Sequence, residues 1–131
     1  MRSSFNKHVG LRVLEFKDGA SLIALRVEPQ HLNGNGVVHG GVMFTMADTG
    51  MGAALLSTLA EGERCATIEL KINYFRPVPG GELHCRSQIV HRGRTTAYLE
   101  SVVSVDAAVV GKAVGTFTIL RPGAAAPASA Q

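Results

Sequence analysis

Apolar and polar residues alternate along several segments of the chain, and this period of two predicts β-strands that bury one face. Asp18-Gly19 separates the first two segments and favours a tight hairpin turn. Ala107-Ala108 is the predicted turn between the last two. The predicted strands cover residues 11–16, 21–27, 66–74, 83–90, 96–105 and 109–120.

The strand predicted at residues 66–74 shows the alternation most clearly. Its two faces are predicted to carry Ala66, Ile68, Leu70, Ile72 and Tyr74 on one side, and Thr67, Glu69, Lys71 and Asn73 on the other. In an uninterrupted strand the apolar set packs on the core, and the polar set points away from it.

A longer segment does not alternate, because residues 42–60 are apolar or small on every side apart from one carboxylate, Asp48. A helix that is apolar all round belongs in a protein core or in a membrane. Asp48 near its middle, and the two glycines that follow, argue against a membrane span. We therefore predict a buried central helix over Val42–Ala60, preceded by a turn-rich segment at residues 32–41.

Two strands, one long helix and four further strands predict an α+β fold, in which a single antiparallel sheet wraps around one long central helix. The sheet covers one side of this helix, yet the other side is apolar too. A second copy of the helix is the natural cover for that side. We therefore expect the protein to form a homodimer.

Composition limits the size of the fold and the choice of partners. The 131 residues suffice for one domain, predicted at residues 10–121, with a lead-in at 1–9 and a disordered tail at 122–131. Charged residues make up only 18% of the chain, which favours a surface partly buried against another subunit. The net charge of +3 comes from scattered Lys and Arg, unlike the basic stripe of a nucleic-acid-binding protein.

Cys65 and Cys85 lie in predicted strands without a CxxC spacing, so we expect reduced core residues of a cytoplasmic protein. The N-terminal residues lack the apolar stretch of a signal peptide. His8, His84 and His91 show no metal-ligand spacing with one another or with carboxylates. Neither a metal nor a cofactor is predicted.

Asp48 is the first candidate for chemistry. A carboxylate is costly to bury in an apolar helix, and in such a place it can act as a general base on water or as a nucleophile. The alternative is structural, namely a hydrogen bond from a neighbouring hydroxyl such as Thr45 or Thr49. The glycine-rich segment before the helix favours the functional interpretation.

Gly40 and Gly41 stand at the start of the helix, where free backbone N–H groups and the helix dipole form a site for an oxyanion. Glycine lets another molecule approach the backbone closely, although it also permits tight packing. Asn33 and His39 nearby are either turn and capping residues or further polar groups of the site.

Gly40 and Asp48 are eight residues apart, which is about 12 Å along one helix. A reacting carbonyl needs its oxyanion donor and its base within about 3–4 Å, so one helix cannot supply both. Two antiparallel copies can, with Gly40 of one protomer opposite Asp48 of the other. The site would then occur twice in a twofold dimer.

The order and spacing of these residues closely resemble the pattern of the PaaI-like (phenylacetic-acid-degradation type) hotdog-fold acyl-CoA thioesterases. The resemblance covers roughly residues 10–120 and extends through the segment 67–77 and the turn 92–94. The residues of its main pattern are His31, Asn33, Gly36, His39, Gly40, Gly41, Ala47 and Asp48.

This resemblance implies a hotdog fold, in dimers that usually pair into tetramers. It also implies a role for each site residue. Asp48 would be the general base or nucleophile, and the N–H of Gly40 from the other subunit would polarise the thioester carbonyl. Asn33 and His39 would help to place the carbonyl and the water, and Thr67 would help to hold the attacking water.

We therefore predict a cytoplasmic, homotetrameric acyl-CoA thioesterase that hydrolyses an acyl- or aryl-CoA to the free acid and coenzyme A. Gly41 is predicted to lie against the substrate. Arg92 and Arg94, which flank Gly93, are predicted to contact the phosphates of coenzyme A, unless this turn is a solvated hairpin tip. The alternatives are a non-catalytic acyl-CoA-binding hotdog module and a hotdog hydratase or dehydratase.

Overall fold

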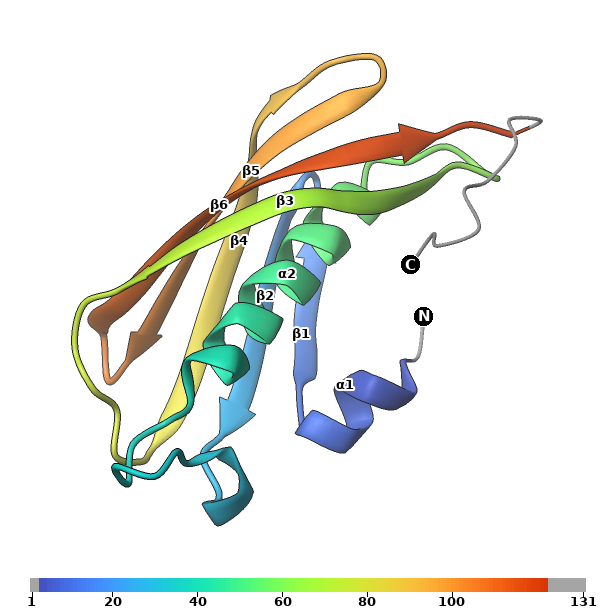
Figure 1. The fold of residues 1–131 in the computed structure, drawn as a ribbon. Coiled ribbons are helices and arrows are strands. Elements are labelled where there is room, and N and C mark those ends of the chain that lie inside the picture. The colour runs from blue at the N-terminus through green and yellow to red at the C-terminus, as the bar shows by residue number, and fades with distance from the viewer. Residues whose placement is uncertain (1–2, 123–131) are drawn as a thin grey trace.

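One long helix lies against one curved antiparallel sheet (Figure 1) in this computed structural model, which describes residues 3–122. The predicted α+β architecture, a sheet wrapped around a central helix, is confirmed. The predicted tail at 122–131 lies outside the described residues, apart from Pro122. The elements are α1 Ser4–Val9, β1 Arg12–Lys17, β2 Ala20–Arg26, the 3₁₀ helix η1 Pro29–His31, α2 Gly40–Leu56, β3 Arg64–Tyr74, β4 Glu82–Arg92, β5 Thr96–Val105 and β6 Ala108–Leu120.

The six strands form one sheet in the order β1-β2-β4-β5-β6-β3, and every neighbouring pair is antiparallel. The hairpin predicted at Asp18-Gly19 joins β1 and β2, and its two residues have φ values of 52° and 83°. Left-handed backbone at both positions matches the twist of the flanking strands. β1 and β3 form the two edges of the sheet, so within residues 3–122 each has one side without a neighbouring strand.

The last hairpin turns one residue earlier than predicted. Asp106 and Ala107 have φ values of 49° and 66°, and Ala108 already belongs to β6. No glycine or asparagine marks this turn in the sequence, so the usual signal for left-handed backbone is missing.

The central helix differs from the prediction at both ends, since α2 covers Gly40–Leu56 instead of Val42–Ala60. His39 caps its start. At its end, the hydroxyls of Ser57 and Thr58 donate to carbonyls of the last helical turn, at 2.7 and 2.8 Å. Such side-chain bonds compete with helical backbone bonds, which explains the early stop. No helix within residues 3–122 has the length and apolar character needed to cross a lipid bilayer.

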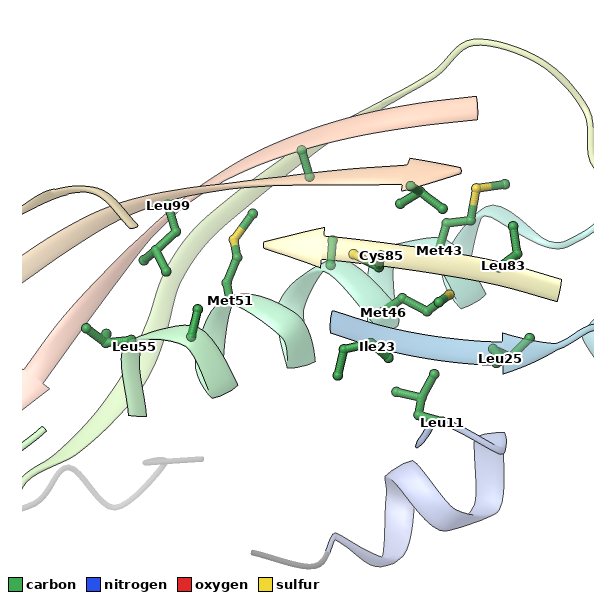
Figure 2. Close-up of a cluster of buried hydrophobic side chains, with 14 of the residues drawn as sticks. Leu11, Ile23, Leu25, Met43, Met46, Met51, Leu55, Leu83, Cys85 and Leu99 are labelled. Carbon is green, nitrogen blue, oxygen red and sulfur yellow. The ribbon is translucent and has the colours of Figure 1, made fainter. Parts of the chain in front are cut away.

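The core fills the space between α2 and the sheet (Figure 2). Side chains on one side of α2 point toward β2, β4 and β5 and are at most 3% exposed. On the opposite side Phe44 is 39% exposed and Asp48 is half-buried, so the sheet leaves this side partly open, as expected. The core side chains labelled in the figure include Met43, Met46, Met51 and Leu55 from α2, and Ile23, Leu25, Leu83 and Leu99 from the strands.

The regular alternation predicted for β3 is wrong, because a β-bulge interrupts it. Thr67 and Glu69 pair with successive residues of β6, so Ile68 is an extra residue without a partner of its own. Before the bulge Thr67 faces α2, and after it Leu70 and Ile72 pack against the core. Ile68, predicted to share their face, is instead 59% exposed.

Candidate active site

Asp48 lies on the partly open side of α2, where the carboxylate accepts a hydrogen bond of 2.6 Å from the Thr67 hydroxyl to its Oδ1. Neither Thr45 nor Thr49, the two neighbouring hydroxyls named for a structural role, bonds to Asp48. Thr45 donates instead to the carbonyl of Gly41, and Thr49 donates to the side chain of Asn6. Within residues 3–122 no other hydrogen bond reaches the Asp48 carboxylate. Its second oxygen is therefore free to meet a water molecule or a substrate.

Both cysteines are free thiols beside or within the core. Burial, and to a smaller extent the negative charge of Asp48, raise the pKa of the half-buried Cys65. Burial raises the pKa of Cys85 to about 11. Both thiols are thus protonated at neutral pH, and neither is an activated nucleophile. In the described part of the chain, no three His, Cys, Asp or Glu side chains gather as a metal site would need.

The start of α2 leaves one backbone amide available. The Gly41 N–H donates to His39 Nδ1 at 2.8 Å, and the Val42 N–H donates to the His39 carbonyl at 2.9 Å. Across residues 3–122 no hydrogen bond engages the Gly40 N–H. The amide predicted to bind an oxyanion is therefore open, whereas the Gly41 amide is already occupied by the cap.

His39 and Asn33 both act as local structural groups, and each keeps one donor. Because His39 Nδ1 accepts from a backbone N–H, the neutral imidazole carries its proton on Nε2, and this ring is exposed. Asn33 Oδ1 accepts from the amides of Asn35 and Val37, at 2.9 and 3.3 Å. Its Nδ2 group has no acceptor among the residues that the structure describes. Both the capping and the functional interpretations thus fit these two residues.

Tyr74 also belongs to this site, although the sequence pattern gives it no such role. The Tyr74 hydroxyl donates to the Gly40 carbonyl at 2.7 Å, across 34 positions of the chain. No local signal in the sequence could have found this contact. Tyr74 and Gly40 are two of the residues that line an open groove beside the start of α2, together with Asn33, Val37, Val38, Met43, Phe75, Arg76 and Pro77.

The predicted phosphate-binding turn lies elsewhere. Arg92 contacts the Thr58 carbonyl at 3.5 Å, just beyond the C-terminal end of α2, and lies 3.9 Å from the Glu63 carboxylate. Arg94 is exposed, and no ion pair involves it within the described residues. The Gly93 N–H closes the turn by donating to the Thr96 carbonyl at 2.8 Å. Within one chain the turn is thus at the opposite end of α2 from Gly40, and its contact with coenzyme A stays a prediction.

Gly40 and Asp48 belong to the same uninterrupted helix. Their spacing of eight residues corresponds to about 12 Å along the helix axis. If Gly40 is the oxyanion donor and Asp48 the base, one protomer cannot bring both of its own groups to the same carbonyl.

Comparisons with known proteins agree on one family. Residues 35–109 match the Thioesterase superfamily. A putative esterase of Archaeoglobus fulgidus is 34% identical over 107 residues, which is 80% of this chain and 68% of that protein. The acyl-coenzyme A thioesterase PaaI of Escherichia coli is 30% identical over 91 residues, or 69% of this chain and 63% of PaaI.

The fold agrees with these matches. The solved structure of conserved protein PA5202 from Pseudomonas aeruginosa superimposes with a TM-score of 0.89 at 35% identity, covering 92% of this chain and 96% of that one. An antiparallel sheet wrapped around one long helix is the hotdog fold. The chain belongs to the Thioesterase superfamily and is a PaaI-like hotdog thioester hydrolase.

Proposed function

We propose that the protein hydrolyses acyl-CoA thioesters to a carboxylic acid and coenzyme A. The observation that carries this proposal is the Asp48 carboxylate, bonded to Thr67 through one oxygen and open at the other, on the helix that begins with the free Gly40 amide. A carboxylate base and an oxyanion donor together can catalyse thioester hydrolysis. The similarity to an acyl-coenzyme A thioesterase supports coenzyme A as the thiol.

In this mechanism Asp48 removes a proton from water while the Thr67 hydroxyl helps to hold that water. The resulting hydroxide attacks the thioester carbonyl, and the Gly40 N–H with the α2 dipole stabilises the oxyanion. Collapse of the tetrahedral intermediate breaks the C–S bond, and the thiolate takes up the proton. Direct attack by Asp48, with an anhydride that water then opens, uses the same groups.

A twofold dimer would complete the site, and β3 offers the edge for it. Thr67, beside Asp48, lies toward one end of β3, whereas Tyr74, beside Gly40, is its last residue. If two β3 edges pair antiparallel around an axis between these positions, Thr67 of one protomer comes opposite Tyr74 of the other. Asp48 of one protomer then approaches Gly40 of its partner.

Exposed apolar side chains along α2 and β3 support the same interface. Phe44 is 39% exposed, Ile68 59% and Phe75 55%, which is unusual for large side chains beside a bare strand edge. A second copy would cover them together with the open side of α2. We further propose that two such dimers pair into a tetramer.

The test is release of free thiol from a panel of acyl-CoAs that includes aryl, short-chain and medium-chain groups. We expect at least one of them to yield equal amounts of thiol and carboxylic acid, well above the spontaneous rate. Binding of acyl-CoA without thiol release would instead indicate a non-catalytic module. Addition or loss of water on the acyl chain, with the thioester intact, would indicate a hydratase or dehydratase.

The turn at residues 92–94 provides a separate prediction about coenzyme A. Arg94→Ala is the informative change, because Arg92 also contacts Glu63 and Thr58. If Arg94 binds a phosphate of the substrate, KM should rise about 3- to 10-fold at low salt, with kcat little changed. Lys112→Ala, which removes one exposed charge elsewhere, is the matched control. An unchanged KM would assign the turn to a solvated hairpin tip.

A further inference from the structure

The peptide unit between Gly40 and Gly41 is held at both ends by side chains from two different elements. Its carbonyl accepts a hydrogen bond of 2.7 Å from the Tyr74 hydroxyl at the end of β3. Its N–H donates to His39 Nδ1 at 2.8 Å. The neighbouring peptide unit supplies the free Gly40 N–H, so the clamped unit lies directly beside the proposed oxyanion donor.

We propose that Tyr74 is a positioning residue for this reaction, which holds the Gly40–Gly41 peptide so that the Gly40 N–H points at the developing oxyanion. The inference rests on the proposed function. Two successive glycines give the first turn of α2 more backbone freedom than any other pair of residues would. An oxyanion donor, by contrast, must be held within about 0.5 Å of its productive position. A clamp from outside the helix meets this need.

The contact is not explained by the needs of the helix itself. The Gly40 carbonyl, at the start of α2, already faces an amide one turn further on in the ordinary α-helical pattern. Tyr74 is 48% exposed, so its ring contributes little to the core. The partial burial of the phenol raises its pKa, so the hydroxyl stays protonated, and thus a donor, at neutral pH.

The fit between Tyr74 and Gly40 is also close in space. A Cβ atom built on Gly40 would lie 2.8 Å from the Tyr74 hydroxyl oxygen and 2.9 Å from Cζ. Only glycine at position 40 therefore leaves Tyr74 where it is. This gives the glycine a second purpose besides access for the substrate, because it lets the aromatic ring lie against the backbone that it orients.

Tyr74→Phe tests the proposal, because it removes only the hydroxyl and keeps the ring that lines the groove. With an acyl-CoA that the wild type hydrolyses, we expect kcat to fall about 5- to 30-fold and KM to stay within about twofold. Hydrogen exchange of the Gly41 amide, which is hydrogen-bonded to His39 Nδ1, should be faster in the variant when it is followed by NMR. Tyr98→Phe, which changes an exposed tyrosine of β5, should leave both kinetic constants and the exchange of this amide unchanged.

The outcomes separate this inference from the proposed function. If Asp48→Asn abolishes thiol release while Tyr74→Phe keeps the wild-type kcat, the positioning role is overturned and the thioesterase proposal stands. An increase in KM alone would make Tyr74 a binding residue and overturn the role as well. If no acyl-CoA is hydrolysed by the wild type, unchanged amide exchange in Tyr74→Phe would still refute the clamp.

Discussion

Asp48→Asn is expected to lower thiol release by about 10²- to 10⁴-fold, the usual contribution of a positioned general base. The amide has nearly the same shape as the carboxylate and still offers an oxygen to the Thr67 hydroxyl. It cannot, however, accept a proton from water or attack the thioester. Initial rates at saturating acyl-CoA measure the effect, and equilibrium binding of the same substrate should change little.

Asp106→Asn is a suitable control for this variant. Asp106 is an exposed carboxylate in the turn before β6, with a φ of 49°, a conformation that asparagine adopts readily. It should therefore fold and turn over like the wild type. A folded Asp48→Asn protein with a rate near that of the wild type would remove Asp48 from the mechanism.

Cys65 reports independently on the charge of Asp48. The negative charge of Asp48 is one of the two causes that raise the pKa of the Cys65 thiol, burial being the larger. In Asp48→Asn this second cause disappears, so the Cys65 pKa falls and more thiolate is present at a given pH. Alkylation of Cys65 at mildly alkaline pH should thus be faster in the variant. An equal rate would mean that the charge at position 48 has no influence on Cys65.

Much of the fold follows from periodicity that is local in the sequence. The strands of the sheet could be predicted because side chains alternate between two faces, and the Asp18-Gly19 hairpin because its residues tolerate left-handed backbone. The central helix was recognisable because it is apolar all round. Its end was not, since the hydroxyls of Ser57 and Thr58 decide it through single hydrogen bonds.

The bulge in β3 shows where this kind of prediction fails. A strict period of two would place Thr67 and Leu70 on opposite faces of β3. The Thr67 hydroxyl would then point away from Asp48. The extra residue, Ile68, restores the contact by shifting the register between Thr67 and Glu69. One inserted residue is invisible in an alternating pattern, yet it aims the side chain that bonds to the carboxylate. Bulges are common beside active sites for this reason.

The spacing of Gly40 and Asp48 was the most informative feature that the sequence alone supplied. Both residues lie on α2, so the distance follows from helical geometry and needs no knowledge of tertiary contacts. The positions of the Thr67 and Tyr74 hydroxyl groups, by contrast, could not be predicted from spacing along the chain. Thr67 reaches Asp48 across 19 positions and Tyr74 reaches Gly40 across 34, so only the folded sheet brings them to the helix.

The shared site predicts that two inactive variants restore activity when they are mixed. Asp48→Asn lacks the base. Gly40→Val disturbs the oxyanion donor, because its Cβ would lie 2.8 Å from the Tyr74 hydroxyl oxygen and displace the side chain that holds this peptide. Gly40 does not have positive φ, so valine meets no backbone strain there. After the subunits exchange at random, half of the dimers are hybrids, and one of the two sites in each hybrid is intact. Activity should recover to about a quarter of the wild-type value.

The matched control is a mixture of wild type with the double variant Asp48→Asn/Gly40→Val, prepared in the same way. If each site is shared, every site of a hybrid carries one lesion, so only wild-type dimers act and this mixture also gives about a quarter. If each chain holds its own site, the single variants stay inactive together while the control mixture gives about half. Native mass spectrometry measures the fraction of hybrid dimers in both mixtures. A mixture in which the subunits have not exchanged is therefore recognised and is not mistaken for evidence of separate sites. The ratio of the two activities, near one for a shared site and near zero for separate sites, decides where the thioester is held.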